Sequence, residues 1–319
     1  MKFSVSESTP GSEKKHFSAA VIGSGPAGLT AAIYLGRSKV DTVIFEKIVP
    51  GGYIINVEKI ENYPGFVEGI SGQELGKLYV QHAKRFGAEI INEETTKLDL
   101  DKTPFIIETS AGSYTADSLI IACGSSSKKI GVPGEEEFIH KGISFCAACD
   151  GPFFEGENVV VVGAGNSGTQ EALYISKFAK HITIVEFLAH PTCEPILLDR
   201  INNSDKIELL TSHTVVSFKG DQFLQSVDIK DINSGEIKSI QAKGSFIYAG
   251  EVPNSGLVKN KMELDKNGYI VTDKHLRTSV KGVFAAGNVR DTTFRQVATA
   301  IGDGAVAAHE AYRYLEQNK

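Results

Sequence analysis

The sequence predicts an α/β protein made of two Rossmann-like, three-layer βαβ nucleotide-binding domains, the second inserted into the first. Three observations support this prediction. The chain has 319 residues, about the right length for two domains. Two segments, residues 18–47 and 158–187, each combine an apolar strand, a glycine-rich turn, a helix rich in small residues and a second strand. The predicted strands and turns that follow the first segment also recur, in the same order, after the second segment.

The first segment carries a complete dinucleotide-binding pattern. Gly23, Gly25 and Gly28 form G-x-G-x-x-G between the strand and the helix, and Glu46 closes the second strand. The start of such a helix offers unpaired N–H groups to a pyrophosphate, and an acid about 20 residues later accepts hydrogen bonds from a ribose. A glycine triplet alone would also fit an ordinary turn, but this context predicts dinucleotide binding.

The second segment repeats the plan with Gly163, Gly165, Gly168 and Glu186, and in both copies the acid lies 23 residues after the first glycine. The repeat predicts a second domain of the same fold. It leaves the ligand of that domain open, because a shared backbone motif does not by itself specify what is bound.

The remaining elements also recur in order. Residues 106–127 predict a hairpin and then a buried strand that ends at Gly124, and residues 226–250 predict a strand, an Asn-Ser-Gly turn, a strand and an apolar strand that ends in glycine. The tail, 282–317, predicts a strand, a loop and a helix from about Gln296 that returns to the first domain.

These signals divide the chain into a first domain, residues 1–128 and 252–319, and an inserted domain, residues 131–249. The chain crosses between them near Lys129 and near Gly250. Two short crossings are typical of a hinge.

Composition narrows the functional classes. The formal net charge is −6 and the pI is about 5.8, so no global positive field favours nucleic acid or an anionic membrane surface. No apolar run approaches the length of a membrane span, and residues 1–17 lack the apolar stretch of a signal peptide. We expect a cytoplasmic protein that binds neither nucleic acid nor membrane.

Two of the four cysteines, Cys146 and Cys149, form a C-x-x-C pair. Zinc is disfavoured because no second pair of ligands exists: Cys123 ends a buried strand and Cys193 is isolated, so we expect no metal. A two-residue spacer allows a disulfide to open and close reversibly. The adjacent Asp150 either carries a proton for a thiolate or is an ordinary turn carboxylate before Gly-Pro.

Together these motifs and the tail "FRQVATAIGDGAVAA" resemble the low-molecular-weight thioredoxin reductases, from about Phe17 to Leu315. The resemblance implies an FAD-containing homodimer in which a flavin and a dithiol exchange electrons. It also implies that the inserted domain rotates, so that the cysteines alternate between the flavin and thioredoxin or a thioredoxin-like protein.

The resemblance assigns roles residue by residue. Cys146 and Cys149 match the redox pair and Asp150 its acid, with Cys149 facing the flavin and Cys146 attacking the thioredoxin disulfide. "GSGPAG" at 23–28 matches the FAD pyrophosphate turn, and Glu46 matches the adenosine ribose contact. The full set of implied cofactor contacts is Gly23, Gly25, Pro26, Ala27, Gly28, Glu46, Lys47, Gly51, Gly52, Tyr53, Asn62, Gly124, Gly287, Asn288, Arg295, Gln296 and Val297.

Two flavin-side positions depart from the family pattern. Asn288 stands where an aspartate usually binds the ribityl chain, and an amide is able to make the same hydrogen bond. Tyr53 stands where a glutamine is usual. Its ring either stacks on the flavin or only fills space.

The largest departure concerns the electron donor. Family members that use NADPH carry a His-Arg-Arg run after the second strand, whereas this chain has "VEFLAHPTCEP" with Glu186, His190 and Glu194. A carboxylate near a 2'-phosphate costs about 1–3 kcal/mol in addition to the lost charge-assisted hydrogen bonds, so NADPH is disfavoured.

Two interpretations of the donor remain. Either Glu186 binds the ribose of NADH, or no nicotinamide binds and the domain survives as a carrier of the cysteines. We favour the second interpretation. It resembles the branch of thioredoxin reductases that is independent of pyridine nucleotides, some of whose members take electrons from ferredoxin. Candidate basic contacts for an acidic ferredoxin are Arg37, Lys39, Lys128, Lys129, Arg290 and Arg295.

Two rival functions are weaker. A ferredoxin or flavodoxin NAD(P) reductase of the same architecture lacks the C-x-x-C pair. A structural or sensory flavoprotein would leave that pair without a role.

Overall fold

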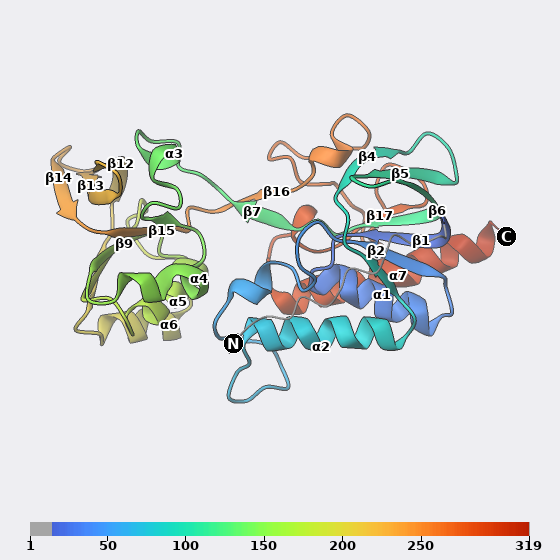
Figure 1. Ribbon diagram of the computed structural model, residues 1–319, viewed down its shortest axis with the longest axis horizontal. Helices are drawn as coiled ribbons and strands as arrows, with labels where there is room; N and C mark the ends of the chain where they lie inside the picture. The colour runs from blue at the N-terminus through green and yellow to red at the C-terminus, as the bar shows by residue number, and fades with distance from the viewer. Residues whose placement is uncertain (1–14, 319) are drawn as a thin grey trace. The chain divides into compact units, whose positions relative to one another are not determined.

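The computed structural model describes residues 15–318; the N-terminal segment that bears on the expected lack of a signal peptide lies mostly outside the described residues. The described chain forms two compact units (Figure 1). Unit 1 extends to Ile55, continues over Lys59–Ser126 and resumes at Pro253, and unit 2 comprises Asn56–Glu58 and Ser127–Val252. The chain therefore leaves unit 1, builds most of unit 2 and returns.

Unit 1 is built on a mostly parallel sheet. Among the described residues it has seven strands in the order β3-β2-β1-β6-β5-β4, with β17 also paired to β6. The central strand β1 runs parallel to β2 and β6, and Val21 pairs with Ile44 on one side and Ile120 on the other. The strands are β1 His16–Ile22, β2 Thr42–Phe45, β3 Glu89–Ile91, β4 Thr95–Asp99, β5 Phe105–Thr109, β6 Ser113–Ile121 and β17 Val283–Ala285.

Helices α1 (Pro26–Arg37), α2 (Gly72–Arg85) and α7 (Val297–Gln317) cover one face of this sheet (Figure 1). Small residues allow α1 and α7 to approach closely, because a Cβ on Gly304 would lie only 2.2 Å from the Ala27 carbonyl oxygen. The predicted C-terminal helix is confirmed, with Gln296 as its N-cap.

The opposite face of the sheet packs against the returning C-terminal segment rather than against long helices. Phe17, Phe45 and Ile107 project from the sheet into this second core, where they meet Val258 and Ile270. The third layer of unit 1 is thus made of loops and the short 3₁₀ helix η3 (Gly256–Val258).

Unit 2 repeats the parallel design in a smaller form. Its main sheet has the order β11-β10-β9-β15-β8. Val161 on β9 pairs with Ile184 on β10 and with Phe246 on β15. The strands are β8 Ile143–Ser144, β9 Asn158–Val162, β10 His181–Val185, β11 Ile207–Leu210 and β15 Gly244–Ile247. The predicted α/β class with Rossmann-like parallel sheets is confirmed in both units.

Helices and a second sheet complete unit 2. The antiparallel sheet consists of β12 (His213–Gly220), β13 (Leu224–Asp231) and β14 (Ile237–Gln241), and the predicted Asn-Ser-Gly turn at 233–235 joins β13 to β14. The helices are α3 Glu135–Phe138, α4 Ala147–Asp150, α5 Asn166–Ile175 and α6 Pro195–Asn202. Ala147, Ala172 and Ile175 pack α4 and α5 into one core beneath the parallel sheet.

The two chain crossings are short strands, β7 (Ser125–Ser127) and β16 (Glu251–Pro253), which pair with each other. Over residues 15–318, no helix combines the length and apolar character that crossing a membrane would require.

Candidate functional site

The two cysteines of the C-x-x-C pair lie on the carboxyl side of β8 in unit 2. Cys146 is the N-cap of α4 and Cys149 lies within that helix, and they form a disulfide with a Cα–Cα distance of 5.3 Å. The backbone N–H of Cys149 donates a hydrogen bond to Cys146 Sγ at 3.2 Å. Cys146 is half-buried, whereas Cys149 is exposed. The pair can therefore be reached by a redox partner.

A buried serine that the sequence reasoning missed connects this pair to Asp150. The Ser144 hydroxyl donates to Asp150 Oδ2 at 2.6 Å and accepts a hydrogen bond from the Cys146 backbone N–H at 3.0 Å. The serine two residues before the first cysteine was the available sequence signal. One hydroxyl thus joins the Asp150 carboxylate to the Cys146 backbone, and the proton-transfer role of Asp150 stays a prediction.

The other two cysteines do not join this site. Cys123 follows β6 in unit 1, and its thiol donates to the Ile22 carbonyl at 3.5 Å. Burial raises the pKa of Cys123 to about 12, so the thiol is unreactive near neutral pH. Cys193 is a free thiol in the loop after β10.

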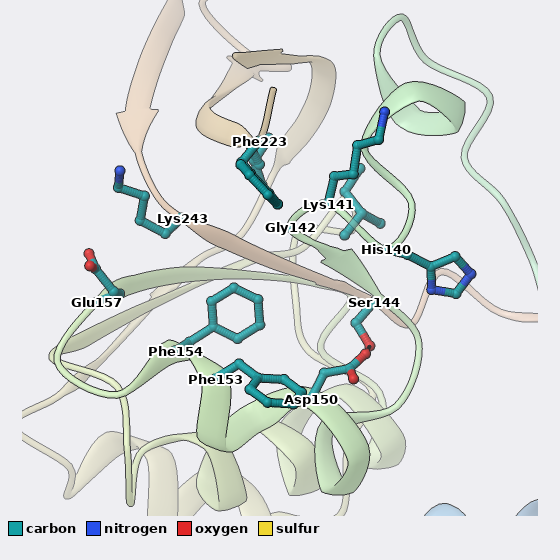
Figure 2. Close-up of a pocket in the computed structure, with 12 residues that line it drawn as sticks. His140, Lys141, Gly142, Ser144, Asp150, Phe153, Phe154, Glu157, Phe223 and Lys243 are labelled. Atoms are coloured by element: carbon teal, nitrogen blue, oxygen red, sulfur yellow. Dashed lines mark hydrogen bonds between the residues drawn. The ribbon is translucent and has the colours of Figure 1, made fainter. Parts of the chain in front are cut away.

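A pocket of about 570 Å³ opens beside Asp150 within unit 2. Figure 2 shows the Ser144 and Asp150 side chains pointing toward each other at its edge, with Phe153 and Phe154 nearby. Phe153 is 80% exposed and Phe223, on the turn between β12 and β13, is 63% exposed. The pocket is lined by His140, Lys141, Gly142, Ile143, Ser144, Asp150, Phe153, Phe154, Glu157, Phe223, Leu224 and Lys243.

In unit 1 the first glycine turn leaves the start of α1 available to a ligand. Gly25 is the N-cap and Pro26 the first helical residue, and no side chain caps α1 among the described residues. Glu46 Oε2 accepts hydrogen bonds from the Ser24 backbone N–H at 3.0 Å and from the Ser24 hydroxyl at 2.5 Å. Glu46 therefore braces the turn, and its expected ribose contact stays a prediction.

The Gly51-Gly52 segment crosses directly over this turn. The Gly51 N–H donates to the Ser24 carbonyl at 3.0 Å. Gly52 has φ +72°, and a Cβ there would lie 2.5 Å from Gly25 Cα, so a side chain would collide with the turn. The heavy atom nearest to a Cβ built on Gly25 would be Gly52 Cα, at an ordinary contact distance of 3.9 Å, so no side chain covers Gly25.

More of the expected cofactor residues come together from distant parts of unit 1. Asn62 Nδ2 donates to Gln296 Oε1 at 3.1 Å, although 234 positions separate them. A Cβ on Gly287 would lie 2.9 Å from Ala27 Cβ, so these two residues are in close contact. Val297 is the first residue of α7, directly after Gln296.

Arg295 gives an independent indication that a polar group fits here. Its guanidinium stacks over the Tyr269 ring at 4.0 Å, and its buried Nε has no hydrogen-bond partner among residues 15–318. A buried donor without a partner is costly unless a ligand supplies the acceptor. With the open turn, this orphaned donor shows that the residues present fit a large polar cofactor such as FAD.

The remaining residues predicted to contact the cofactor have the following places in the structure. Lys47 forms an exposed ion pair with Glu94, with Nζ 3.0 Å from Oε1. Tyr53 begins the 3₁₀ helix η1 (Tyr53–Asn56) and is 44% exposed, and Gly124 follows β6 with φ +65°. The Asn288 amide donates to the Ser125 hydroxyl at 3.4 Å. Their contacts with a cofactor stay predictions.

The second glycine turn, in unit 2, has the same backbone plan. Glu186 is 7% exposed, and its carboxylate accepts from the Ala164 N–H at 2.6 Å and from the Leu188 N–H at 2.9 Å. It thus braces this turn as Glu46 braces the first. The loop that follows, residues 187–194, contains no lysine or arginine.

Comparisons with known proteins agree with this geometry. The family described as pyridine nucleotide-disulphide oxidoreductase matches residues 17–304. A thioredoxin reductase of Bacillus subtilis (strain 168) is 39% identical over 307 residues, which cover 96% of this chain and 97% of the relative.

Solved structures of thioredoxin reductases also resemble this chain. The chain resembles the Lactococcus lactis thioredoxin reductase (FR conformation), with a TM-score of 0.92, 38% identity and coverage of 94% and 99% of the two chains. It also resembles T. acidophilum thioredoxin reductase, with a TM-score of 0.91, 38% identity and coverage of 96% and 100%. A ferredoxin-flavin thioredoxin reductase from Clostridium acetobutylicum is more distant, at 25% identity and a TM-score of 0.52.

Proposed function

The chain belongs to the pyridine nucleotide-disulphide oxidoreductase family, as a flavin-dependent thioredoxin reductase, and from this membership we propose how its own residues divide the reaction. Unit 1 holds FAD, and unit 2 carries the redox pair Cys146 and Cys149 with Asp150 as its acid. The observation that carries the proposal is the Cys146–Cys149 disulfide linked through Ser144 to Asp150. The proposed domains are residues 1–128 with 252–319, and 131–249.

FAD, when bound, supplies the electron pair that opens the disulfide. We assign its pyrophosphate to the open turn at Gly23–Gly28 under Gly51-Gly52, where unpaired N–H groups begin α1. Arg295 Nε, Asn62 and Gln296 offer polar atoms on the flavin side. For the remaining FAD contacts we propose the residues that the family resemblance implies.

The cysteines then pass the electrons on. Two electrons and two protons convert the disulfide to two thiols, and Asp150, held by Ser144, exchanges a proton with the pair. The Cys146 thiolate attacks a sulfur of the thioredoxin disulfide and forms a mixed disulfide, and Cys149 then attacks Cys146. This second step restores the Cys146–Cys149 disulfide and releases thioredoxin as a dithiol.

The pocket beside Asp150 is the proposed docking site for thioredoxin. Its lining combines two exposed aromatic rings, Phe153 and Phe223, with Asp150, and it also includes Lys141 and Lys243. Exposed aromatic groups with a few charged neighbours are typical of protein-binding surfaces.

We propose that the physiological donor is a protein such as reduced ferredoxin, and NADH is the alternative. The support is the absence of arginine and lysine from 187–194 and the carboxylate of Glu186 at the second turn. Of the candidate ferredoxin contacts, Arg290 is engaged internally: its Nε lies 2.8 Å from Asp303 Oδ2, and its side chain is only 17% exposed. The basic surface must therefore come from other residues.

Stopped-flow measurement of flavin bleaching with NADPH, NADH and reduced ferredoxin in turn tests the donor. We expect ferredoxin to reduce the flavin fastest and micromolar NADPH to be ineffective. Reduction by NADPH at about 10 s⁻¹, an ordinary enzyme turnover, would contradict the proposal. Fast reduction by NADH alone would instead make Glu186 a ribose ligand.

We also propose a homodimer, as the family resemblance implies. Unit 1 exposes several apolar side chains that an interface would cover, among them Ile48, Val49 and Val67. Light scattering on the FAD-loaded protein should give twice the chain mass of 34.3 kDa. A monomer at micromolar concentration would contradict this proposal.

A further inference from the structure

The loop between β10 and α6, residues 187–194, folds back over the second glycine turn. The Thr192 N–H donates to the Ala164 carbonyl at 3.1 Å. Glu194 and Asn166 exchange two hydrogen bonds: the Glu194 N–H donates to Asn166 Oδ1 at 2.7 Å, and Asn166 Nδ2 donates to Glu194 Oε1 at 3.2 Å. The loop is thus tied both to the turn and to the first residue of α5.

Thr192 lies where a bound dinucleotide would approach. In a Rossmann turn, the middle glycine of G-x-G-x-x-G lets the pyrophosphate come close to the backbone. Here that glycine is Gly165, and the atom nearest to a Cβ built on it is Thr192 Oγ1, at 3.6 Å. A side-chain atom of Thr192 therefore lies within contact distance above Gly165, where the first turn has only the backbone of Gly52.

The charge at this turn is also wrong for a pyrophosphate. The N-terminus of a helix attracts an anion through its exposed N–H groups. At α5 that position already has the Glu194 carboxylate, bridged to Asn166. An incoming pyrophosphate would meet this negative charge at short range.

Unit 1 shows the same crossing without these obstacles. There the Gly51 N–H bonds the Ser24 carbonyl, the equivalent of the Thr192–Ala164 bond, but the crossing residues have no side chains. Pro26 replaces Asn166 as the first helical residue and has no group to anchor a carboxylate.

We propose that Thr192 and Glu194 are specificity-determining residues that exclude nicotinamide dinucleotides from unit 2. The Thr192 side chain narrows the space over Gly165, and Glu194, anchored by Asn166, repels the pyrophosphate. This inference deepens the proposed choice of donor and rests on it. The second nucleotide fold then serves as the framework that carries the redox pair.

The test uses the FAD-loaded enzyme, so that the turn of unit 1 is filled, and measures binding of NADH and of ADP-ribose by calorimetry. We expect no saturable binding to the wild-type enzyme up to about 1 mM, a concentration that corresponds to about −4 kcal/mol. Thr192→Gly with Glu194→Gln should bind both ligands at least about tenfold more tightly. Adding Gly165→Ala to this double variant should abolish the gained binding, because the new methyl group refills the space.

Two results would overturn the inference: micromolar binding of ADP-ribose to the wild-type enzyme, or no gain in a double variant that keeps its flavin absorbance and melting temperature. If the double variant does not fold, Thr192→Gly and Glu194→Gln measured singly each test one half of the inference by the same binding gain. The donor proposal fails separately, through fast reduction of the wild-type flavin by NADH or NADPH.

Discussion

Units 1 and 2 begin with the same strand, glycine turn, helix and strand, yet the two turns are completed differently. In unit 1 the crossing residues are Gly51 and Gly52, which place backbone but no side chain over Gly25. In unit 2 the crossing residue is Thr192, whose side chain lies over Gly165. The glycines, their spacing and the bracing acids Glu46 and Glu186 are alike in both units.

This contrast shows what a G-x-G-x-x-G motif does and does not determine. The glycines specify a backbone path, because a side chain at the third glycine would collide with the carbonyl oxygen of the first: 2.0 Å for Gly28 on Gly23 and 2.1 Å for Gly168 on Gly163. We propose that the ligand depends on the segment that crosses the turn five or six residues after the acid. On this proposal the two copies of the fold have different tasks.

The largest effect is expected from a substitution in the redox pair, which should abolish the reaction in unit 2 and leave FAD binding in unit 1 unchanged. Cys149→Ser should lower thioredoxin reduction by about 10³-fold or more, because no thiol remains to resolve the mixed disulfide, while FAD content stays unchanged. The measurement mixes dithionite-reduced enzyme, freed of excess reductant, with oxidised thioredoxin and follows the thioredoxin that is released as the free dithiol. Cys193→Ser is the matched control. A Cys149→Ser enzyme within tenfold of wild type would mean that the electrons take another route.

Glycine-to-alanine substitution at the equivalent positions of the two turns should affect FAD binding in one unit only. Gly25→Ala should fold normally, because the nearest atom is 3.9 Å away, but should bind FAD about 10- to 100-fold more weakly by crowding the pyrophosphate. Gly165→Ala meets Thr192 Oγ1 at an ordinary 3.6 Å and should leave both FAD content and turnover within about twofold. Flavin absorbance after dialysis compares the two variants. Equal loss of FAD from both would remove the distinction between the turns.

A smaller effect is expected at the hydrogen-bonded serine of unit 2. Ser144→Ala removes the hydroxyl that donates to Asp150 and should slow thioredoxin reduction about tenfold, the cost of one hydrogen bond to a charged group. Ser176→Ala, which removes a hydroxyl bonded to the Leu173 carbonyl in the same unit, should change the rate little. If both variants have the wild-type rate, Asp150 acts without support from Ser144.

The smallest expected signal comes from Cys123 in unit 1. Its pKa is raised to about 12, so at pH 8 only about 10⁻⁴ of the thiol is ionised, and the thiolate increases about tenfold per pH unit up to that pKa. In the reduced, folded enzyme, iodoacetamide should label Cys146 and Cys149 at pH 8 and leave Cys123 unlabelled, as read by peptide mass spectrometry. Labelling of Cys123 at a rate comparable to that of Cys149 would show that its thiol is not shielded.

Local patterns predicted most of the fold. Each glycine turn lies between a strand and a helix that adjoin it in sequence, and the Asn-Ser-Gly turn follows its strand directly, so short-range sterics specify both. The redox pair was also evident from its spacing. The contact between Ser144 and Asp150 depends instead on how β8 leads into α4, which no periodicity encodes.

Contacts between residues that are distant in sequence could not be predicted either, because they depend on how the loops and sheets are arranged in space. Thr192 meets Gly165 across a loop whose path depends on the Asn166–Glu194 hydrogen bonds. Phe223 reaches the pocket from a hairpin of another sheet. In unit 1 the sequence pointed to Asn62 and Gln296 only through the family resemblance, and their hydrogen bond appears once the fold is known.

The exposed rings of Phe153 and Phe223 also bear on how the enzyme behaves in solution. The aromatic surface that we propose as the docking site for thioredoxin is also a surface through which identical molecules can associate. The net charge of −6 opposes this self-association by mutual repulsion, and salt screens that repulsion. We therefore expect the purified enzyme to be least soluble at high ionic strength without thioredoxin, and oxidised thioredoxin to act as a solubilising agent by covering the rings.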